Sequence, residues 1–212
     1  MKEQCGVKLN NRSLSSLKKI LNKWTVIVKD YCDYYDSEDA PYWYGERASI
    51  STFAGAIWKS GGLVLEEYRS TKKNRKEKWE GRVDLHFSLN DRGYVVEAKH
   101  EWFNLNLQKS TSNIEEEVSI KLRDAVKDVK NSNQYRDTSL GILFAVPVIP
   151  KSLIDVSDPL LETFLKGVQM IDYCLLAWQF PKSAKLLEDE KKIYPGVVLI
   201  GRVPRRRGPS PK

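Results

Sequence analysis

Residues 81–102, GRVDLHFSLNDRGYVVEAKHEW, contain two runs of alternating apolar and polar side chains separated by a turn. The turn is predicted at residues 90–93 (NDRG), because Asn, Asp and Gly tolerate the backbone angles that a tight hairpin requires. Alternation with a period of two places every second side chain on the same face of a strand. We therefore expect a hairpin whose first strand has Val83, Leu85 and Phe87 on one face and Asp84 on the other.

The polar side chains of this hairpin can form a reactive group. Glu97 and Lys99 are two residues apart, so they share a face about 7 Å apart along the strand, and pairing across the hairpin can bring Asp84 to that face. Hard cations such as Mg²⁺ prefer carboxylate oxygens, and a bound divalent metal ion polarises a phosphoryl oxygen and lowers the pKa of a bound water. A neighbouring lysine can orient or deprotonate that water. The simplest alternative is a solvated sheet face on which Glu97 and Lys99 form a surface ion pair that contributes little.

Asp84 followed, after the turn, by Glu97-Ala98-Lys99 resembles the signature of the PD-(D/E)xK nuclease superfamily, which includes many restriction endonucleases, Holliday junction resolvases and RecB-like nucleases. The resemblance covers only the core of the chain, and Val83 stands where the family name has Pro. It implies that Asp84, Glu97 and the backbone carbonyl of Ala98 bind Mg²⁺, for which Mn²⁺ can substitute. It also implies that Lys99 positions or activates the water that hydrolyses a phosphodiester bond in DNA, with RNA as an alternative substrate.

The resemblance further implies a metal-binding glutamate in the helix before the first strand. Residues 42–59 predict such a helix, with Ile50 and Ile57 on its apolar face. Glu46 lies one helical turn before Ile50, where a carboxylate is costly unless it has a partner such as a metal ion. We take Glu46 as the third ligand and keep Glu66 or Glu67 of the next strand as alternatives. A partly exposed glutamate in the first helical turn is the simplest interpretation of Glu46.

The rest of the chain predicts the surroundings of this core. Apolar periodicity predicts further helices and strands, the helices at 13–35 (with Ser13 as N-cap), 114–130 and 160–166, and the strands at 63–70, 139–147, 169–180 and 195–203. Residues 139–147 form a continuous apolar run, which is typical of a central strand buried on both faces. From 42 to 147 the order is helix, strand, strand, strand, helix, strand, which matches the α-β-β-β-α-β core of the family that the motif resembles. We expect an α/β (α+β) fold with a central mixed sheet flanked by helices, in one domain over residues 1–204 with C-terminal additions at 158–203.

The formal net charge of +7 is concentrated locally, and local basic clusters are typical of proteins that bind polyanions. Two groups of basic residues are expected to hold the DNA backbone. The first, in a predicted charged turn at 72–80, is Lys72, Lys73, Arg75, Lys76 and Lys78, and the second, in a C-terminal tail (205–212) expected to be disordered, is Arg205, Arg206 and Arg207. Lysine-rich surface loops also occur simply because they are well solvated.

Composition excludes several other classes of protein. The three cysteines are widely separated and only two histidines occur, so neither a disulfide framework nor a zinc site is expected. No apolar run approaches the length of a membrane span, and the first residues contain no signal-peptide core, so we expect a cytoplasmic protein without a membrane partner. A homodimer is compatible with the sequence. The alternatives to a nuclease are a non-catalytic nucleic-acid-binding module and a protein-interaction protein on the same fold.

Overall fold

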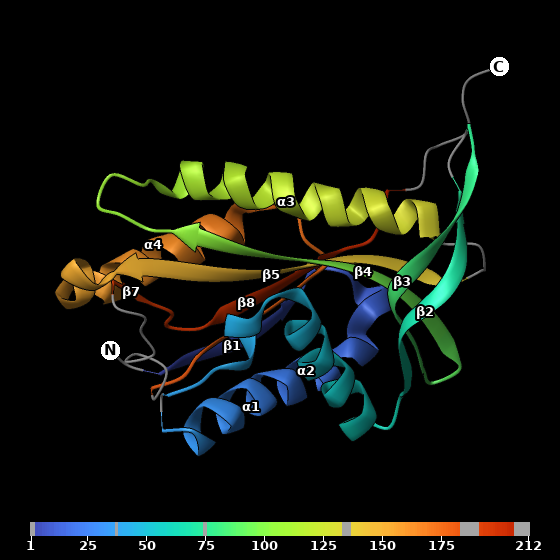
Figure 1. The fold of residues 1–212 in the computed structure, drawn as a ribbon, viewed down its shortest axis with the longest axis horizontal. Coiled ribbons are helices and arrows are strands. Elements are labelled where there is room, and N and C mark those ends of the chain that lie inside the picture. Colours follow the sequence, from blue (N-terminus) through green and yellow to red (C-terminus); the bar gives the residue numbers. More distant parts are fainter. Residues whose placement is uncertain (1–2, 37, 74–75, 133–136, 183–190, 206–212) are drawn as a thin grey trace.

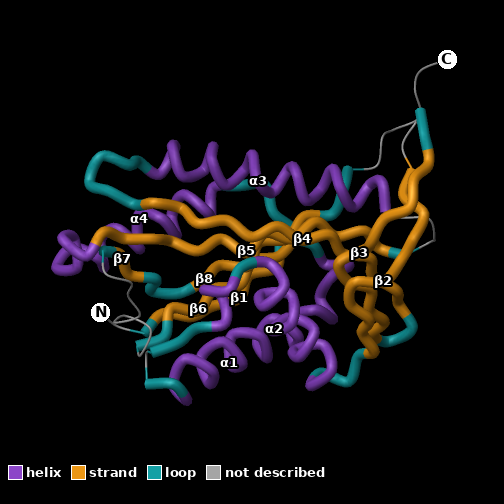
Figure 2. The backbone as a smooth tube through the Cα atoms, viewed as in Figure 1, coloured by secondary structure: helices purple, strands orange, loops and turns teal. Residues whose placement is uncertain are grey.

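The computed structural model describes residues 3–36, 38–73, 76–132, 137–182 and 191–205. In these residues a mixed sheet of eight strands runs through the molecule, and helices cover both of its faces (Figures 1 and 2). The strand order is β1-β6-β8-β5-β4-β3-β2, with β7 paired to β5 outside this path. This α+β arrangement, a mixed sheet flanked by helices, confirms the predicted fold class at that level.

The elements follow the predicted order in the core. The strands are β1 Gln4–Leu9, β2 Leu63–Lys73, β3 Lys78–Leu89, β4 Arg92–Asn104, β5 Thr138–Pro150, β6 Leu175–Phe180, β7 Lys192–Ile193 and β8 Val197–Arg202. The helices are α1 Lys18–Tyr34, α2 Glu46–Lys59, α3 Thr111–Ser132 and α4 Ser157–Met170, with 3-10 segments η1 Arg12–Leu17, η2 Pro41–Tyr44 and η3 Lys151–Val156. The sequence α2-β2-β3-β4-α3-β5 is the helix, strand, strand, strand, helix, strand order that the sequence predicts.

Two apolar layers hold the sheet between the helices. On one face, α1 and α2 pack over the sheet, and on the other face α3 and α4 do so. Strand β5 lies between β4 and β8 and contributes to both layers: Phe144 packs toward α1 and α2, and Leu143 packs toward α3 and α4. The prediction that this apolar run is a central strand buried on both faces is confirmed.

Helix α3 connects β4 to β5, which are the one parallel pair among the described strands. Its buried face carries Ile114, Val118, Leu122, Ala125, Val126 and Val129, as its periodicity predicts. The close approach of α3 to β5 depends on Gly141, because a Cβ there would lie 2.6 Å from the backbone nitrogen of Val126. The crossover helix therefore lies directly against the central strands and brings its C-terminal turns close to β4.

The predicted starts of the first two helices are wrong, and the local backbone geometry explains both differences. The first helix begins as the 3-10 segment η1, and Asn11, which accepts a hydrogen bond from the Ser13 N–H, is its N-cap in place of Ser13. Helix α2 begins at Glu46, not at residue 42, because Gly45 has φ of 88° and separates it from η2.

None of the described helices combines the length and apolarity needed to cross a membrane.

Three further features of the strands differ from the predictions. Residues 169 and 170 end α4, so only the later part of the predicted strand at 169–180 forms β6. Strand β1 was not predicted, and it extends the sheet by pairing antiparallel with β6. Residues 72, 73 and 78–80 lie in β2 and β3 and not in a charged turn. Arg206 and the remainder of the predicted disordered tail lie outside the described residues.

Candidate active site

The candidate site lies where β3 and β4 separate. The two strands are joined by a two-residue turn, Asn90-Asp91, in which both residues have positive φ (49° and 59°), the arrangement of a type I′ hairpin. Pairing runs from Leu89 opposite Arg92 to Leu85 opposite Val96, and the next position would pair Asp84 with Glu97. There the pairing ends. The outer half of β3 continues with β2, and β4 continues with β5, as Figure 1 shows.

The alternation of side chains changes at the same point. Leu85 belongs to the layer under α1 and α2, whereas Val83 packs with Val95 and with Val129 of α3. The prediction that Val83 and Leu85 share a face is therefore wrong. The pairing of β2 with β3 skips Glu67 and Asp84, which lie between the pairs Glu66–Leu85 and Tyr68–Val83, and Glu67 has a left-handed φ of 53°. Asp84 thus occupies an irregular position and not a regular step of the sheet.

Asp84 is partly buried and Glu97 is buried, and the two carboxylates have different hydrogen-bond partners. Asp84 Oδ2 accepts a hydrogen bond of 2.7 Å from the backbone N–H of Ala98, on the edge of β4 that β3 has left. Glu97 is 3 % exposed, and its Oε1 accepts hydrogen bonds from the Ser132 hydroxyl of α3 and from Lys72 Nζ at 2.8 Å. The two partners of Glu97 Oε1, Lys72 of β2 and Ser132 of α3, both lie far from Glu97 in the chain.

These carboxylates lie in surroundings that disfavour their ionised forms. Burial, reinforced by the negative charge of Asp84, raises the pKa of Glu97 to about 7 although Lys72 and Ser132 act in the opposite direction. Burial also raises the pKa of Asp84, against the Ala98 N–H and the charges of Lys99 and Lys72. Burial is therefore the main reason that the ionised forms of both carboxylates are disfavoured, and the nearby lysines only partly offset it.

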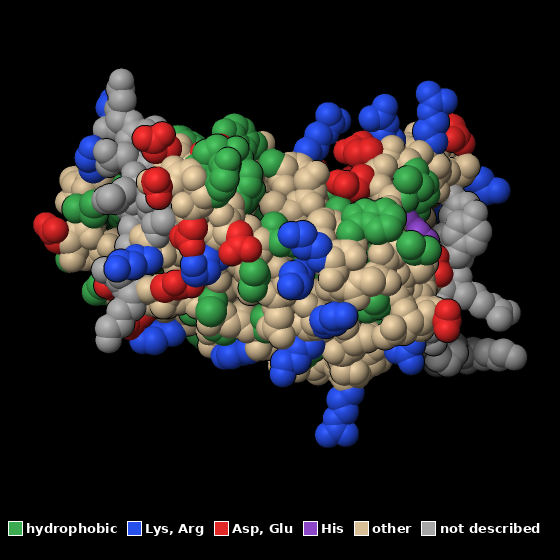
Figure 3. Space-filling model, turned by 90° about the horizontal axis from the view of Figure 1, so that it is seen from below, with side chains coloured by type: hydrophobic (Ala, Val, Ile, Leu, Met, Phe, Trp, Pro, Cys, Tyr) green, Lys and Arg blue, Asp and Glu red, His purple; other side chains and the backbone are tan. Residues whose placement is uncertain are grey.

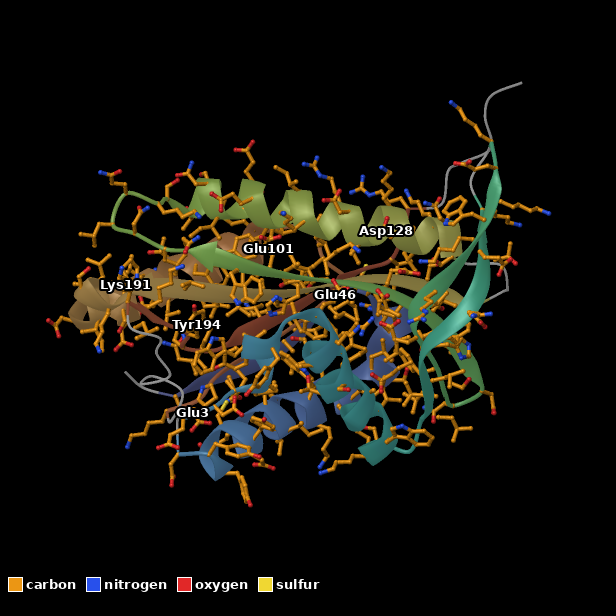
Figure 4. All side chains as sticks on the ribbon, in the orientation of Figure 1. Glu3, Glu46, Glu101, Asp128, Lys191 and Tyr194 are labelled. Carbon is orange, nitrogen blue, oxygen red and sulfur yellow. The ribbon has the colours of Figure 1, made fainter. Side chains whose placement is uncertain are left out.

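Lys99 lies on the α3 side of β4 and pairs with Asp128 of α3, with 2.9 Å between Nζ and Oδ2 (Figure 4 labels Asp128). Burial lowers the pKa of Lys99, but the hydrogen bond and charge of Asp128 outweigh it and raise the pKa above its ordinary value. Lys99 is therefore an ammonium group at neutral pH. In the described residues Glu97 pairs with Lys72 and Lys99 with Asp128, so the simple surface ion pair between Glu97 and Lys99 does not form.

Glu46 approaches β4 from the opposite side, at the start of α2 (Figure 4). Burial raises its pKa, while the charge of Lys99 and the backbone N–H of His100 lower it and the charge of Asp84 raises it further. Glu46 is thus within electrostatic range of Asp84 and Lys99, as the sequence predicts. Among the described residues, however, no three His, Cys, Asp or Glu side chains are arranged so that they could hold a metal ion.

The two alternative glutamates differ in their surroundings. Glu67 lies in β2 beside the unpaired position of Asp84, and its negative charge raises the pKa values of Asp84 and Glu46. Glu66 lies toward α2, where the Ser51 hydroxyl is 3.4 Å from its Oε2. Of these two, Glu67 is the carboxylate that belongs to the group.

The predicted DNA-contacting residues differ in whether their side chains reach the surface. Lys72 is a strand residue with a side chain only 15 % exposed, and it points inward to Glu97, so as placed it does not offer its charge to the surface. Exposed positions are found at Lys73, Lys76 and Lys78, and exposed Arg205 pairs with Asp172 at 2.8 Å. The other three predicted residues, Arg75, Arg206 and Arg207, lie outside the described part of the chain.

Sequence reasoning missed the residues that hold the reactive side chains in place. Asp128 and Ser132 are one helical turn apart at the end of α3, on either side of buried Val129. This spacing was the one available signal, since polar residues flanking an apolar stripe face the edge of the layer below. Lys72 had no such signal, because a lysine in a charged segment is expected to be solvated.

No protein-family model, curated protein or solved structure matches the chain.

Proposed function

We propose that the protein is a metal-dependent nuclease that hydrolyses phosphodiester bonds in DNA on a PD-(D/E)xK-type, restriction endonuclease-like core. One observation carries the proposal. Asp84 and Glu97, two carboxylates whose ionisation burial disfavours, lie where two strands separate, with the charge of Asp84 acting on Glu97 and the ammonium of Lys99 within electrostatic range of Asp84. Perturbed carboxylates gathered with a lysine at an irregular point of a sheet are typical of a reactive site.

The residues present fit a small divalent cation. Mg²⁺ is commonly held by one or two carboxylates and keeps several waters, so Asp84, Glu97 and the carbonyl of Ala98 would suffice as protein ligands, with Glu46 on the other side of β4. The raised pKa values of the two carboxylates indicate that additional positive charge would be stabilised there. When bound, Mg²⁺ or Mn²⁺ would supply Lewis-acid stabilisation of a phosphoryl oxygen and a more acidic water.

Lys99 supplies a fixed positive charge in this proposal. Because its pKa is raised, it is protonated at neutral pH and acts by orienting water or by stabilising charge on the phosphate, and it does not act as a general base. Asp128 positions this ammonium by accepting its hydrogen bond. Lys72 acts as the counter-ion of Glu97 in the absence of metal, so its ammonium would compete with a cation for the same oxygen.

The surface near this group suits a polyanionic substrate. The chain carries a net charge of +7, and Lys73, Lys76 and Lys78 are exposed at the far end of the β2-β3 hairpin. Figure 3 views the molecule from the α1 and α2 side, where lysine and arginine side chains occur over much of its length, with acidic side chains between them. Exposed basic groups of this kind supply sequence-independent contacts to phosphates.

A cleavage assay with plasmid, single-stranded DNA, branched DNA and RNA tests the proposal in Mg²⁺ and in Mn²⁺. We expect Asp84→Asn and Lys99→Ala each to lower the cleavage rate by about a hundredfold or more, and to retain DNA binding in EDTA. The matched control is Lys121→Ala, which removes an exposed lysine that pairs with Glu101. Equal loss of activity in all three variants, or no cleavage of any substrate by the wild type, would contradict the proposal.

A non-catalytic nucleic-acid-binding module is the second candidate. Two observations favour it. Among the described residues no three His, Cys, Asp or Glu side chains are arranged to hold a metal ion, and Glu97 already forms an ion pair with Lys72. This candidate predicts oligonucleotide binding without cleavage and without Mg²⁺ binding by calorimetry. A protein-interaction role would instead leave no DNA affinity even at low salt, where phosphate contacts are strongest.

A further inference from the structure

An open pocket lies beside the candidate active site, between the start of α2 and the middle of the β2-β3 hairpin. Its volume is about 340 Å³, and it is lined by Arg47, Ile50, Ser51, Glu66, Glu67 and Arg82. Two arginines and two glutamates therefore meet in one open hollow. The proposed reaction assigns no role to the arginines.

Both arginines are directed at a single carboxylate. Arg47 Nε lies 3.5 Å from Glu67 Oε1, and Arg82 Nη1 lies 3.4 Å from Glu67 Oε2. The side chains of Arg47 and Arg82 are 80 % and 60 % exposed, so these ion pairs are well solvated and contribute little to stability. Another anion could therefore take the place of Glu67 at small cost.

Glu67 is held in an unfavourable position. Its φ of 53° is uncommon for a residue other than glycine and marks local strain. Its charge also opposes the ionisation of Asp84 and Glu46. The two arginines offset the charge of Glu67 through their ion pairs, and they would offset the charge of a phosphate in the same place.

We propose that Arg47 and Arg82 form a binding subsite for a phosphate of the nucleic-acid backbone, and that Glu67 occupies this subsite as an internal anion until a phosphate displaces it. The identity of the ligand rests on the proposed nuclease function. Guanidinium groups match phosphate oxygens in geometry and charge. Glu67 and Asp84 lie between the same two pairs of residues on adjacent strands, and the charge of Glu67 acts on Asp84, so the bound phosphate would be close to the one that is hydrolysed.

The chain offers a matched control next to Glu67. Glu66 carries the same charge and lines the same pocket, but it lies near the hydroxyl of Ser51, and in the described residues neither arginine pairs with it. Glu67→Gln and Glu66→Gln therefore change the net charge equally. They differ in whether two arginines are released.

The experiment measures binding of a fluorescein-labelled DNA oligonucleotide by anisotropy, in EDTA and over a series of salt concentrations, so that no cleavage occurs. We expect Glu67→Gln to bind at least about fivefold more tightly than Glu66→Gln at low salt, with a steeper dependence on salt because two more cations are available to phosphates. Arg47→Ala and Arg82→Ala should weaken binding. The gain from Glu67→Gln should disappear when it is combined with both arginine changes.

Equal affinities of Glu67→Gln and Glu66→Gln would overturn the proposal, because the effect would then be one of net charge. A gain that survives loss of both arginines, or no binding by any variant at low salt, would also overturn it. The expected pattern in a protein that cleaves no substrate would support the phosphate subsite while the nuclease function fails. The two proposals can therefore fail separately.

Discussion

Replacement of Glu97 by glutamine should make the metal-free protein more stable above neutral pH. Glutamine has nearly the same shape and can still accept a hydrogen bond from Ser132 and from Lys72, but it does not ionise. Glu97 is buried, and its pKa of about 7 exceeds the ordinary value of 4.5. The folded protein therefore binds a proton at Glu97 that the unfolded chain has already lost in the range between these two values.

The sign and size of the effect follow from this difference. A raised carboxyl pKa gives a stabilising contribution that is fully present below the pKa of the unfolded chain and is lost as the pH rises through the pKa of the folded protein. The gap corresponds to about 3 kcal/mol, at about 1.4 kcal/mol for each pKa unit. From about pH 5 to about pH 8, the free energy of unfolding of the wild type should fall by up to about 3 kcal/mol relative to Glu97→Gln.

Urea denaturation followed by tryptophan fluorescence, in EDTA at a series of pH values, measures this difference, and Trp24 is a buried reporter. The matched control is Glu101→Gln on the same strand, where the carboxylate is about one-third exposed and pairs with Lys121. If the difference between Glu97→Gln and the wild type stays constant with pH, or if Glu101→Gln shows the same change with pH, the electrostatic role assigned to Glu97 is refuted. Mg²⁺ should stabilise the wild type at pH 8 and leave Glu97→Gln unchanged.

Two further predictions concern the lysines of the site. Lys72→Met removes the ammonium that competes for Glu97 Oε1. At pH 8 the affinity for Mg²⁺, measured by calorimetry, should therefore rise by about tenfold, or about 1.4 kcal/mol. Loss of DNA affinity with unchanged Mg²⁺ affinity would instead indicate that Lys72 contacts DNA. Asp128→Asn removes the anion that raises the pKa of Lys99 against the effect of burial, so the alkaline limb of the pH–rate profile for cleavage should move to lower pH. An unchanged alkaline limb would show that the charge of Lys99 does not control the rate.

Local patterns in the sequence were sufficient to predict many of the strands and helices. The hairpin around Asn90-Asp91, the buried stripe of α3 and the apolar run of β5 all depend on spacings within one element, and each was predicted. The choice of Asp84, Glu97 and Lys99 as one group was equally local, because a short turn makes the two strands of a hairpin neighbours, although the regular alternation expected at Asp84 ends there. Strand β1 was missed because its pairing with β6 joins residues far apart in the chain.

The partners of these side chains depended on tertiary structure alone. Glu97 pairs with Lys72 and Ser132, and Lys99 pairs with Asp128, each about 25 to 35 residues away in the chain. No local pattern predicts which charged groups meet across such distances, since that depends on how α3 crosses the sheet and how β2 curves. Burial at that junction then decides the ionisation state of each group. The sequence by itself determined which residues could form a reactive site, and the packing of α3 and β2 against β4 decided how their charges are balanced.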